Sequence, residues 1–337
     1  MKKILFWIFI FILTVTVLSI GLIKFTNHLS QFRISSTVDS SEKKIKTACW
    51  IAPDTALIPN SSEGEMIRYG RDLIARTAFY LGPKGIVLQI NNGMNCQNCH
   101  LDAGTKPWGN NFSAVYSCYP KFRERSGSVE GIVKRVNDCF ERSLNGKSLD
   151  STSREMQAIL AYIQWLGKGV KKGEKPNGVG IADLTFPDRA ANPINGKIIF
   201  ADKCARCHGA NGSGQLNEDA SIYTYPPLWG EKSYNTGAGL YRIGRFAGFV
   251  KNNMPFGASY DSTILTDEEA WDVAAFVNSQ PRPQKDLSHD YPKISSKPFD
   301  YPFGPYSDGF TEAQHKFGPF APIKKVIEES KKKLKSP

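Results

Sequence analysis

Apolar and polar positions follow one another along the chain in a pattern that predicts two helical units of similar layout. The segments 153–167 and 266–279 repeat apolar residues about every 3.6 positions, which is the period of an amphipathic helix. Each segment closes a unit that opens with another helical stretch, at 64–80 and at 194–200. A Thr-x-x-Glu capping box at Thr266 predicts where the last of these helices begins. The pattern therefore predicts a mainly α fold.

The stretch between the two units differs in composition, because residues 167–193 are rich in Gly, Lys and Pro and show no steady period. Such a composition is typical of a linker that runs over the surface. We expect two mostly helical domains, at 63–170 and 194–283, joined by a linker at 171–193. A C-terminal extension follows at 284–337; it is rich in Pro, Tyr and Phe, and its final lysines are interpreted as a solvated terminus.

The N-terminus carries an uncharged run at 4–23, which follows two lysines and is long enough to span a bilayer. The run also fits a signal peptide, but no good small-residue cleavage site follows it. We therefore expect a single transmembrane or signal helix at 1–24, with an uncleaved anchor favoured, and a polar spacer at 25–62. The remainder is predicted to lie on the periplasmic side of the inner membrane, anchored there or soluble in the periplasm after cleavage.

Each unit contains one copy of the pentapeptide Cys-X-X-Cys-His, at 96–100 and at 204–208. This spacing is the attachment signature of a c-type haem, in which the two thiols bind the vinyl groups and the imidazole binds the iron. A zinc site is the alternative, but such sites rarely place His directly after the second Cys. The sequence thus predicts two covalently bound haem c groups, held by Cys96, Cys99 and His100 and by Cys204, Cys207 and His208.

The second unit offers a sulfur ligand for the other face of its iron. Met254 directly precedes Pro255, some tens of residues after the haem motif and before the closing helix. A thioether in this place raises the haem potential. The alternatives are that Met254 only packs in the core, as methionine often does, or that Lys251 is the ligand.

The first unit has no Met-Pro pair but carries a cysteine in a predicted helix within 127–146. Arg135 lies four residues before Cys139 and Ser143 lies four after it, so an α-helix would put all three on one face. Nearby cations, including Arg125, would keep such a thiol reactive by lowering its pKa. Alternatively, Cys139 is a buried free thiol or a disulfide partner.

The cysteine count bears on this choice, because the chain has seven cysteines and the haems use four. Cys49, Cys118 and Cys139 remain, and an exported protein meets an oxidising compartment. The simplest assignment is a Cys49–Cys118 disulfide, which leaves Cys139 for another task.

The chain resembles the dihaem thiosulfate dehydrogenase and tetrathionate reductase family in three segments, at 92–104, 135–146 and 253–255. The resemblance covers about residues 64–283 and implies two cytochrome c-like domains in tandem. The chain has Asn253 before its methionine, where some members have Lys.

The resemblance also implies site roles and a reaction. Cys139 would be the catalytic distal ligand of the first haem, and Arg125, Arg135 and Ser143 would help to hold the substrate. Two thiosulfates would join to tetrathionate with release of two electrons, or the reverse. The electrons would pass to the haem ligated by Met254, and then to a small c-type cytochrome or another periplasmic electron carrier.

The net charge of +11 favours anionic partners and substrates through the field of the whole molecule. Nucleic acid is not expected as a partner of an exported haem protein. Other functions remain open: a non-catalytic dihaem electron-transfer cytochrome, or a sulfur-carrier-loading cytochrome with a Cys-ligated haem. A dihaem peroxidase would need a displaceable iron site with acid–base groups, and a helix-borne cysteine argues against it.

Overall fold

Helices make up most of the secondary structure in the computed structural model, which describes residues 48–219 and 222–333. The helix expected at 1–24 and most of the spacer lie outside the described residues. Within the described part of the chain, no helix combines the length and apolar character needed to cross a membrane. Membrane anchoring therefore stays a prediction.

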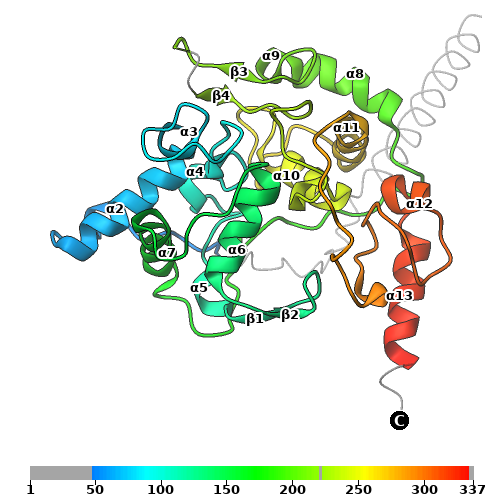
Figure 1. Ribbon diagram of the computed structural model, residues 1–337. Coiled ribbons are helices and arrows are strands. Elements are labelled where there is room, and N and C mark those ends of the chain that lie inside the picture. The colour runs from blue at the N-terminus through cyan, green and yellow to red at the C-terminus, as the bar shows by residue number, and fades with distance from the viewer. Residues whose placement is uncertain (1–47, 220–221, 334–337) are drawn as a thin grey trace, which may run out of the picture. The chain divides into compact units, whose positions relative to one another are not determined.

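The first domain is built from helices and one small hairpin (Figure 1). Strands β1 (Lys121–Arg123) and β2 (Ser128–Glu130) pair antiparallel. Its helices are α2 (Ser62–Ala75), α3 (Thr77–Leu81), α4 (Leu101–Gly104), α5 (Val115–Cys118), α6 (Ile132–Asp138), the π-helical turn η3 (Cys139–Ser143) and α7 (Arg154–Gly167), with short 3₁₀ turns at Thr55–Leu57 and Cys96–Asn98.

The second domain and the C-terminal extension are also mainly helical. The domain contains α8 (Pro193–Lys203), α9 (Ala205–His208), the paired strands β3 (Gln215–Leu216) and β4 (Tyr223–Tyr225), the 3₁₀ turn η4 (Gly239–Tyr241), α10 (Ile243–Asn253) and α11 (Asp267–Ser279). The extension adds η5 (Ile294–Ser296), α12 (Glu312–Phe317) and α13 (Ala321–Lys333).

Side-chain caps fix where the long helices begin. The Ser153 hydroxyl accepts from the Met156 backbone N–H at the start of α7. At the start of α11, the Thr266 hydroxyl accepts from the Glu269 N–H, and the Glu269 carboxylate accepts from the Thr266 N–H. The capping box predicted from the sequence is therefore confirmed, and it satisfies two N–H groups that a helix end leaves unpaired.

Each domain is organised on the contact of its first long helix with its last, α2 with α7 and α8 with α11. A glycine permits both approaches. A Cβ added at Gly70 would lie 1.9 Å from the Ala158 carbonyl oxygen, and one at Gly196 would lie 1.9 Å from that of Asp272. Because no side chain fits there, the backbones pack directly on each other and bring the apolar faces together.

Two separate apolar cores result, one in each domain. Fully buried residues of the first include Leu73, Met156 and Tyr162. The second is built around Trp271 and also takes in Phe320 from the C-terminal extension. The extension is therefore part of the folded body.

The two domains also meet directly. The buried Asn92 side chain donates to the Ser233 carbonyl over 3.0 Å, and the Asn253 side chain donates to the Trp108 carbonyl over 3.2 Å. Trp108 stacks on Tyr260, with ring centroids 4.8 Å apart. These contacts bring the segment before the first haem motif and the Met254 loop against the opposite domain.

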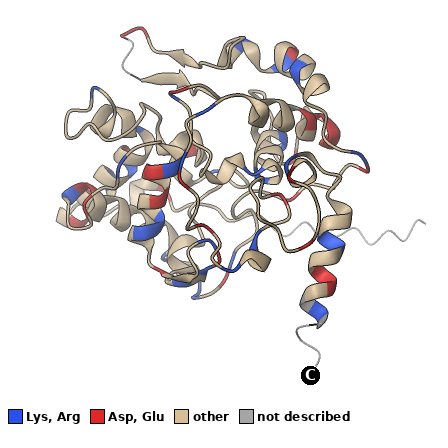
Figure 2. Ribbon diagram, turned by 45° about the vertical axis from the view of Figure 1, so that its right-hand side comes forward, with Lys and Arg blue, Asp and Glu red and all other residues tan. Residues whose placement is uncertain are grey.

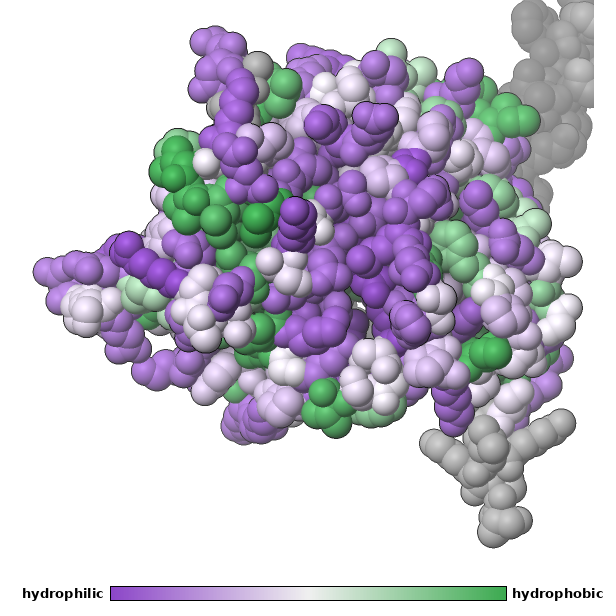
Figure 3. Space-filling model, viewed as in Figure 1, coloured by the Kyte–Doolittle hydropathy of each residue, from purple (hydrophilic) through white to green (hydrophobic). Residues whose placement is uncertain are grey.

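Charged residues of both signs are interspersed over the helices (Figure 2). The face shown in Figure 3 is mostly hydrophilic, with apolar patches between the polar regions. In the described part of the chain, the Lys and Arg side chains are therefore spread over several helices.

The structure overturns the predicted Cys49–Cys118 disulfide, since both residues are free thiols. The Cys49 sulfur accepts from the Asn177 side chain over 3.6 Å, whereas the Cys118 thiol donates to the Glu174 carbonyl over 3.6 Å. Each sulfur has its own hydrogen-bond partner on the 174–177 segment. The disulfide was predicted from the number of cysteines alone, and the fold does not join these two.

Replacing Gly196 by Ala should destabilise the second domain, because the new methyl group would overlap the Asp272 carbonyl and force α8 and α11 apart. Overpacking of this kind costs about 1–3 kcal/mol. The midpoint of thermal unfolding, followed by circular dichroism, should fall. Gly239→Ala is the matched control in the same domain, because nothing lies within 4 Å of its added Cβ. Equal midpoints for the two variants would contradict the close-packing argument.

Candidate active site

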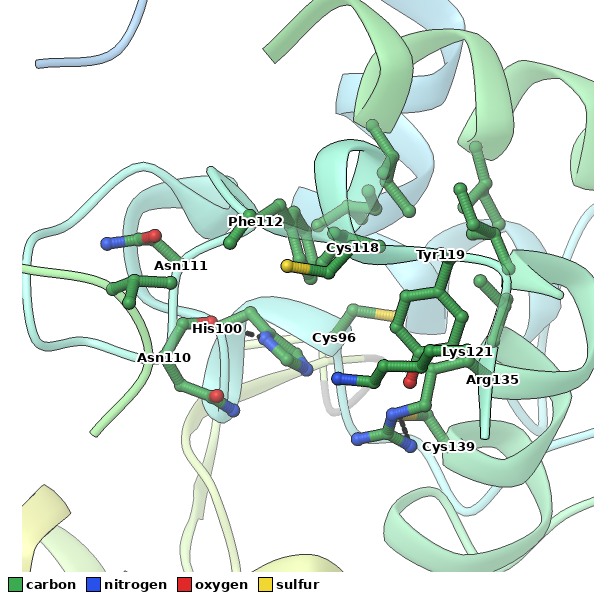
Figure 4. A pocket seen from close by; sticks show the side chains of 18 of the residues that line it. Cys96, His100, Asn110, Asn111, Phe112, Cys118, Tyr119, Lys121, Arg135 and Cys139 are labelled. Carbon is green, nitrogen blue, oxygen red and sulfur yellow. Dashed lines mark hydrogen bonds between the residues drawn. The ribbon is translucent and has the colours of Figure 1, made fainter. Parts of the chain in front are cut away.

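A cavity of about 230 Å³ lies in the first domain and contains the residues predicted to carry its chemistry. Cys96 and His100 of the first haem motif line it together with Arg135 and Cys139. Figure 4 shows His100 on one side and the Arg135–Cys139 pair on another. The helical segment that follows the β-hairpin thus places the Cys139 thiol in the same cavity as His100.

His100 is oriented by its own backbone neighbourhood. Its Nδ1 lies 2.6 Å from the Asn110 carbonyl oxygen, which can only accept, so Nδ1 carries the hydrogen. In the second domain, His208 Nδ1 lies 2.9 Å from the Pro226 carbonyl oxygen. Both imidazoles therefore use Nδ1 for a backbone contact and leave Nε2 as the metal-binding nitrogen, in the arrangement that fixes the tautomer of a metal-binding histidine. Burial also lowers the pKa of His208, which keeps its ring neutral.

Cys139 begins the π-helical turn and meets the guanidinium of Arg135, whose Nη1 lies 3.3 Å from the sulfur. The four-residue spacing on α6 produces this contact, as the sequence predicted. Burial raises the pKa of the Cys139 thiol, but Arg135 and the His100 ring lower it by more, and the result is a pKa of about 7. The thiolate is thus accessible at neutral pH.

Three further cations face the cavity and were missed by the sequence reasoning: Lys121, Arg123 and Lys175. Burial lowers the pKa of Lys121, and the nearby positive charges of Arg123, Lys175 and Arg135 lower it further, whereas the Cys118 thiol opposes the shift. The sequence could have indicated that Lys121 and Arg123 share one side, because residues two apart on a strand such as β1 face the same way.

Two predicted site residues do not line the cavity. Arg125 donates to the Gly237 carbonyl over 2.8 Å, and its Nε lies 3.7 Å from Asp290. Ser143 ends the π-helical turn, whose wider i→i+5 winding removes it from the α-helical register that placed it below Cys139. The structure therefore brings Arg135 and Cys139 together, whereas substrate contacts by Arg125 and Ser143 stay predictions.

A second cavity, of about 530 Å³, lies around the second motif. Cys204, Cys207, His208 and Met254 all line it, and so does Cys99 of the first motif. One pentapeptide therefore reaches both cavities, with Cys96 in the first and Cys99 in the second.

The Met254 loop distinguishes between the candidate ligands of the second domain. The Lys251 ammonium donates to the Leu265 carbonyl over 2.6 Å and pairs with Asp267 at 2.9 Å. It is held away from the cavity lining, whereas Met254 belongs to it. The geometry therefore favours the thioether over the amine.

Both cavities fit a covalently bound haem c. The second cavity presents Cys204, Cys207 and His208 with the Met254 sulfur, and the first presents Cys96 and His100 with the Cys139 sulfur, while Cys99 lines the second cavity. Among the described residues, no group of three or more His, Cys, Asp and Glu side chains could hold a lone metal ion. The fold and these sites define a dihaem c-type cytochrome.

Comparisons with known proteins agree on the class and define it further. Residues 88–171 match the SoxA/TsdA cytochrome c domain family, and residues 194–281 match the cytochrome c family. The thiosulfate dehydrogenase of Allochromatium vinosum is 40% identical over 241 residues, which are 70% of this chain and 86% of that protein. That of Stutzerimonas stutzeri is 33% identical over 273 residues, 81% of this chain and 86% of the relative.

A solved structure supports the same relationship. Thiosulfate dehydrogenase (TsdBA) from Marichromatium purpuratum superimposes with a TM-score of 0.66 at 31% identity. The match covers 81% of this chain but only 54% of that one. The chain belongs to the thiosulfate dehydrogenase family. It is an oxidoreductase with two covalently bound haem c groups.

Replacing Cys139 by Gly should remove the low-spin His/thiolate signal of the first haem while leaving both haems attached, because attachment depends only on the Cys-X-X-Cys-His motifs. Electron paramagnetic resonance of the oxidised protein measures the signal, and mass spectrometry counts the haems. Cys118→Ser is the matched control, since Cys118 also lines the cavity. An unchanged signal in Cys139→Gly would show that this sulfur is not the ligand.

Proposed function

We propose that the first cavity interconverts thiosulfate and tetrathionate, joining two thiosulfates with release of two electrons or running in reverse. The observation that carries the proposal is the Arg135–Cys139 contact of 3.3 Å, opposite a motif histidine in a cavity lined with cations. The relatives are named thiosulfate dehydrogenases, which supports the same substrate.

The charges of the cavity suit this substrate. Thiosulfate is a dianion, and two must meet, so their mutual repulsion has to be offset by fixed positive charge. Arg135, Lys121, Arg123 and Lys175 supply that charge from three separate segments of the chain. The guanidinium groups of Arg123 and Arg135 also match the geometry of sulfonate oxygens. A plain electron-transfer cytochrome has no need of such a lining.

Cys139 supplies the sulfur nucleophile. Its thiolate joins the outer sulfur of a first thiosulfate, and forming this S–S bond releases two electrons. The outer sulfur of a second thiosulfate then attacks the bound one, which forms tetrathionate and returns the thiolate. Arg135 stabilises the thiolate in the resting and product states, because its positive charge lowers the pKa of Cys139. The reverse sequence of the same bonds reduces tetrathionate.

Haem c groups held by Cys96, Cys99 and His100 and by Cys204, Cys207 and His208 would supply the acceptors for the two electrons and their transfer to an external carrier. Cys96 and Cys99 support a short path, because they line the two neighbouring cavities. The carrier would be a small c-type cytochrome or another periplasmic protein. The periplasm is the proposed location, because haem attachment to the motif takes place there.

Changing Arg135 tests the site assignment. Arg135→Gln should reduce kcat for thiosulfate oxidation by on the order of 10²-fold, the usual loss when one charge-stabilising donor is removed. Arg135→Lys should lose less, because the charge remains. Steady-state assays with purified holoprotein and ferricyanide measure the rate, and tetrathionate is quantified as product. Arg154→Gln is the control, because Arg154 is exposed at the start of α7 and lines neither cavity. Wild-type rates in Arg135→Gln, or no tetrathionate from the wild type, would refute the proposal.

Met254 is expected to set the potential of the second haem. Met254→Gly should shift that potential downward, because a thioether ligand raises it. The first cavity should keep its shape, since Met254 does not line it. Spectroelectrochemical titration provides the measurement. Met156→Leu is the control, because Met156 is fully buried in the core of the first domain. If the high-potential wave is unchanged in Met254→Gly, Met254 is a core residue only.

A further inference from the structure

The π-helical turn that presents Cys139 has an inner and an outer side. On the inner side, Cys139 faces the cavity and meets Arg135. The turn itself is closed by the Leu144 N–H, which donates to the Cys139 carbonyl over 2.9 Å. π-Helical turns are rare and occur frequently at functional sites, so the contacts that hold one in place bear on function.

The outer side is held by residues far away in the sequence. Asn235 of the second domain donates from its side chain to the Glu141 carbonyl over 2.8 Å, and its backbone N–H donates to the Arg142 carbonyl over 3.1 Å. From the C-terminal extension, Lys285 pairs with the Glu141 carboxylate at 3.3 Å.

Asp290 of the extension makes the strongest of these outer contacts. Its two carboxylate oxygens accept from the two terminal nitrogens of Arg142 over 2.8 and 2.7 Å. The side chains of Asp290 and Arg142 are only 7% and 12% exposed. A two-pronged pair shielded from water fixes both distance and direction, unlike an exposed ion pair.

The same carboxylate also holds a second cation. Arg125 Nε lies 3.7 Å from Asp290, and the Tyr291 N–H donates to the Arg125 carbonyl over 2.7 Å. Asp290 therefore lies between two arginines, one next to the β-hairpin and one on the Cys139 turn. Without it, two shielded guanidinium groups would repel each other across the space that it fills.

We propose that Asp290 is a positioning residue for the distal cysteine: through Arg142 it holds the π-helical turn so that the Cys139 sulfur faces His100. This inference rests on the proposed role of Cys139, and it gives the C-terminal extension a part in the active site. Asp290 touches neither cavity, so it acts only through the turn.

The structure offers a matched control on the same extension. Asp300 is 1% exposed and accepts from Arg242 Nε over 2.7 Å and from the Gly244 N–H over 3.1 Å. It is an equally shielded carboxylate–guanidinium pair, but its partner precedes α10 of the second domain. Asp300→Asn therefore reproduces the loss of a shielded ion pair without touching the Cys139 turn.

The test compares Asp290→Asn and Asp300→Asn as purified dihaem proteins. Electron paramagnetic resonance without substrate measures the low-spin His/thiolate signal, and Cys139→Gly in the same series shows which signal belongs to Cys139. We expect Asp290→Asn to lose most of that signal and Asp300→Asn to keep it. In turnover assays, kcat of Asp290→Asn should fall by about ten- to a hundred-fold, the loss that a displacement of about 1 Å causes, with KM little changed.

The outcomes separate cleanly. An unchanged thiolate signal in Asp290→Asn overturns the inference, and so does an equal loss in both variants, which would mean only a general loss of stability. If Asp290→Asn does not accumulate as dihaem protein, Arg142→Gln takes its place, because Asp290 then keeps Arg125 as its partner. Loss of the signal in folded Arg142→Gln supports the inference, and a full signal overturns it. Because the signal is recorded without substrate, failure of the proposed reaction would not mimic either result.

Discussion

The contact between the Arg135 guanidinium and the Cys139 sulfur is the interaction on which the site depends. A thiol inside a protein resists ionisation, because the interior solvates a thiolate poorly. Here the positive charge of Arg135, with the His100 ring, more than offsets that penalty and brings the pKa to about 7. The electrostatic interaction is reciprocal, since the Cys139 thiolate raises the pKa of Arg135. A soft, anionic sulfur is thereby placed where two sulfur dianions would have to meet.

The rest of the first domain holds the two groups that face each other across the cavity, His100 and the Cys139 turn. The Gly70 contact between α2 and α7 allows a close-packed core beside the motif, and the Asn110 carbonyl sets the orientation of His100. The turn that carries Cys139 is held from outside by the second domain and the extension. The active site is therefore built from all three parts of the described chain, although its lining comes from the first domain and the linker.

Local patterns predicted the parts that depend on short-range geometry. The two pentapeptides predicted two haem c groups, the apolar periods predicted the long helices, and the spacing from Arg135 to Cys139 predicted their contact. The prediction for Ser143 assumed that the α-helix continues, and nothing in the local sequence marks the change to a π-helical turn. Arg125 was assigned to the site by the family resemblance and as a nearby cation. Its partner Asp290 is 165 positions away by residue number, and only the fold brings the two together. The disulfide prediction was wrong because counting thiols says nothing about where each sulfur points.

The most direct test of the central claim is to look for the covalent step on Cys139. Oxidised holoprotein would be mixed with thiosulfate under anaerobic conditions without an external acceptor, quenched in acid, and digested for peptide mass spectrometry. The account predicts a mass increase equal to one bound thiosulfate on the peptide that contains Cys139, and none on the peptide that contains Cys118. Tetrathionate formation with no adduct on Cys139 at any quench time, or an adduct on Cys118 instead, would contradict it.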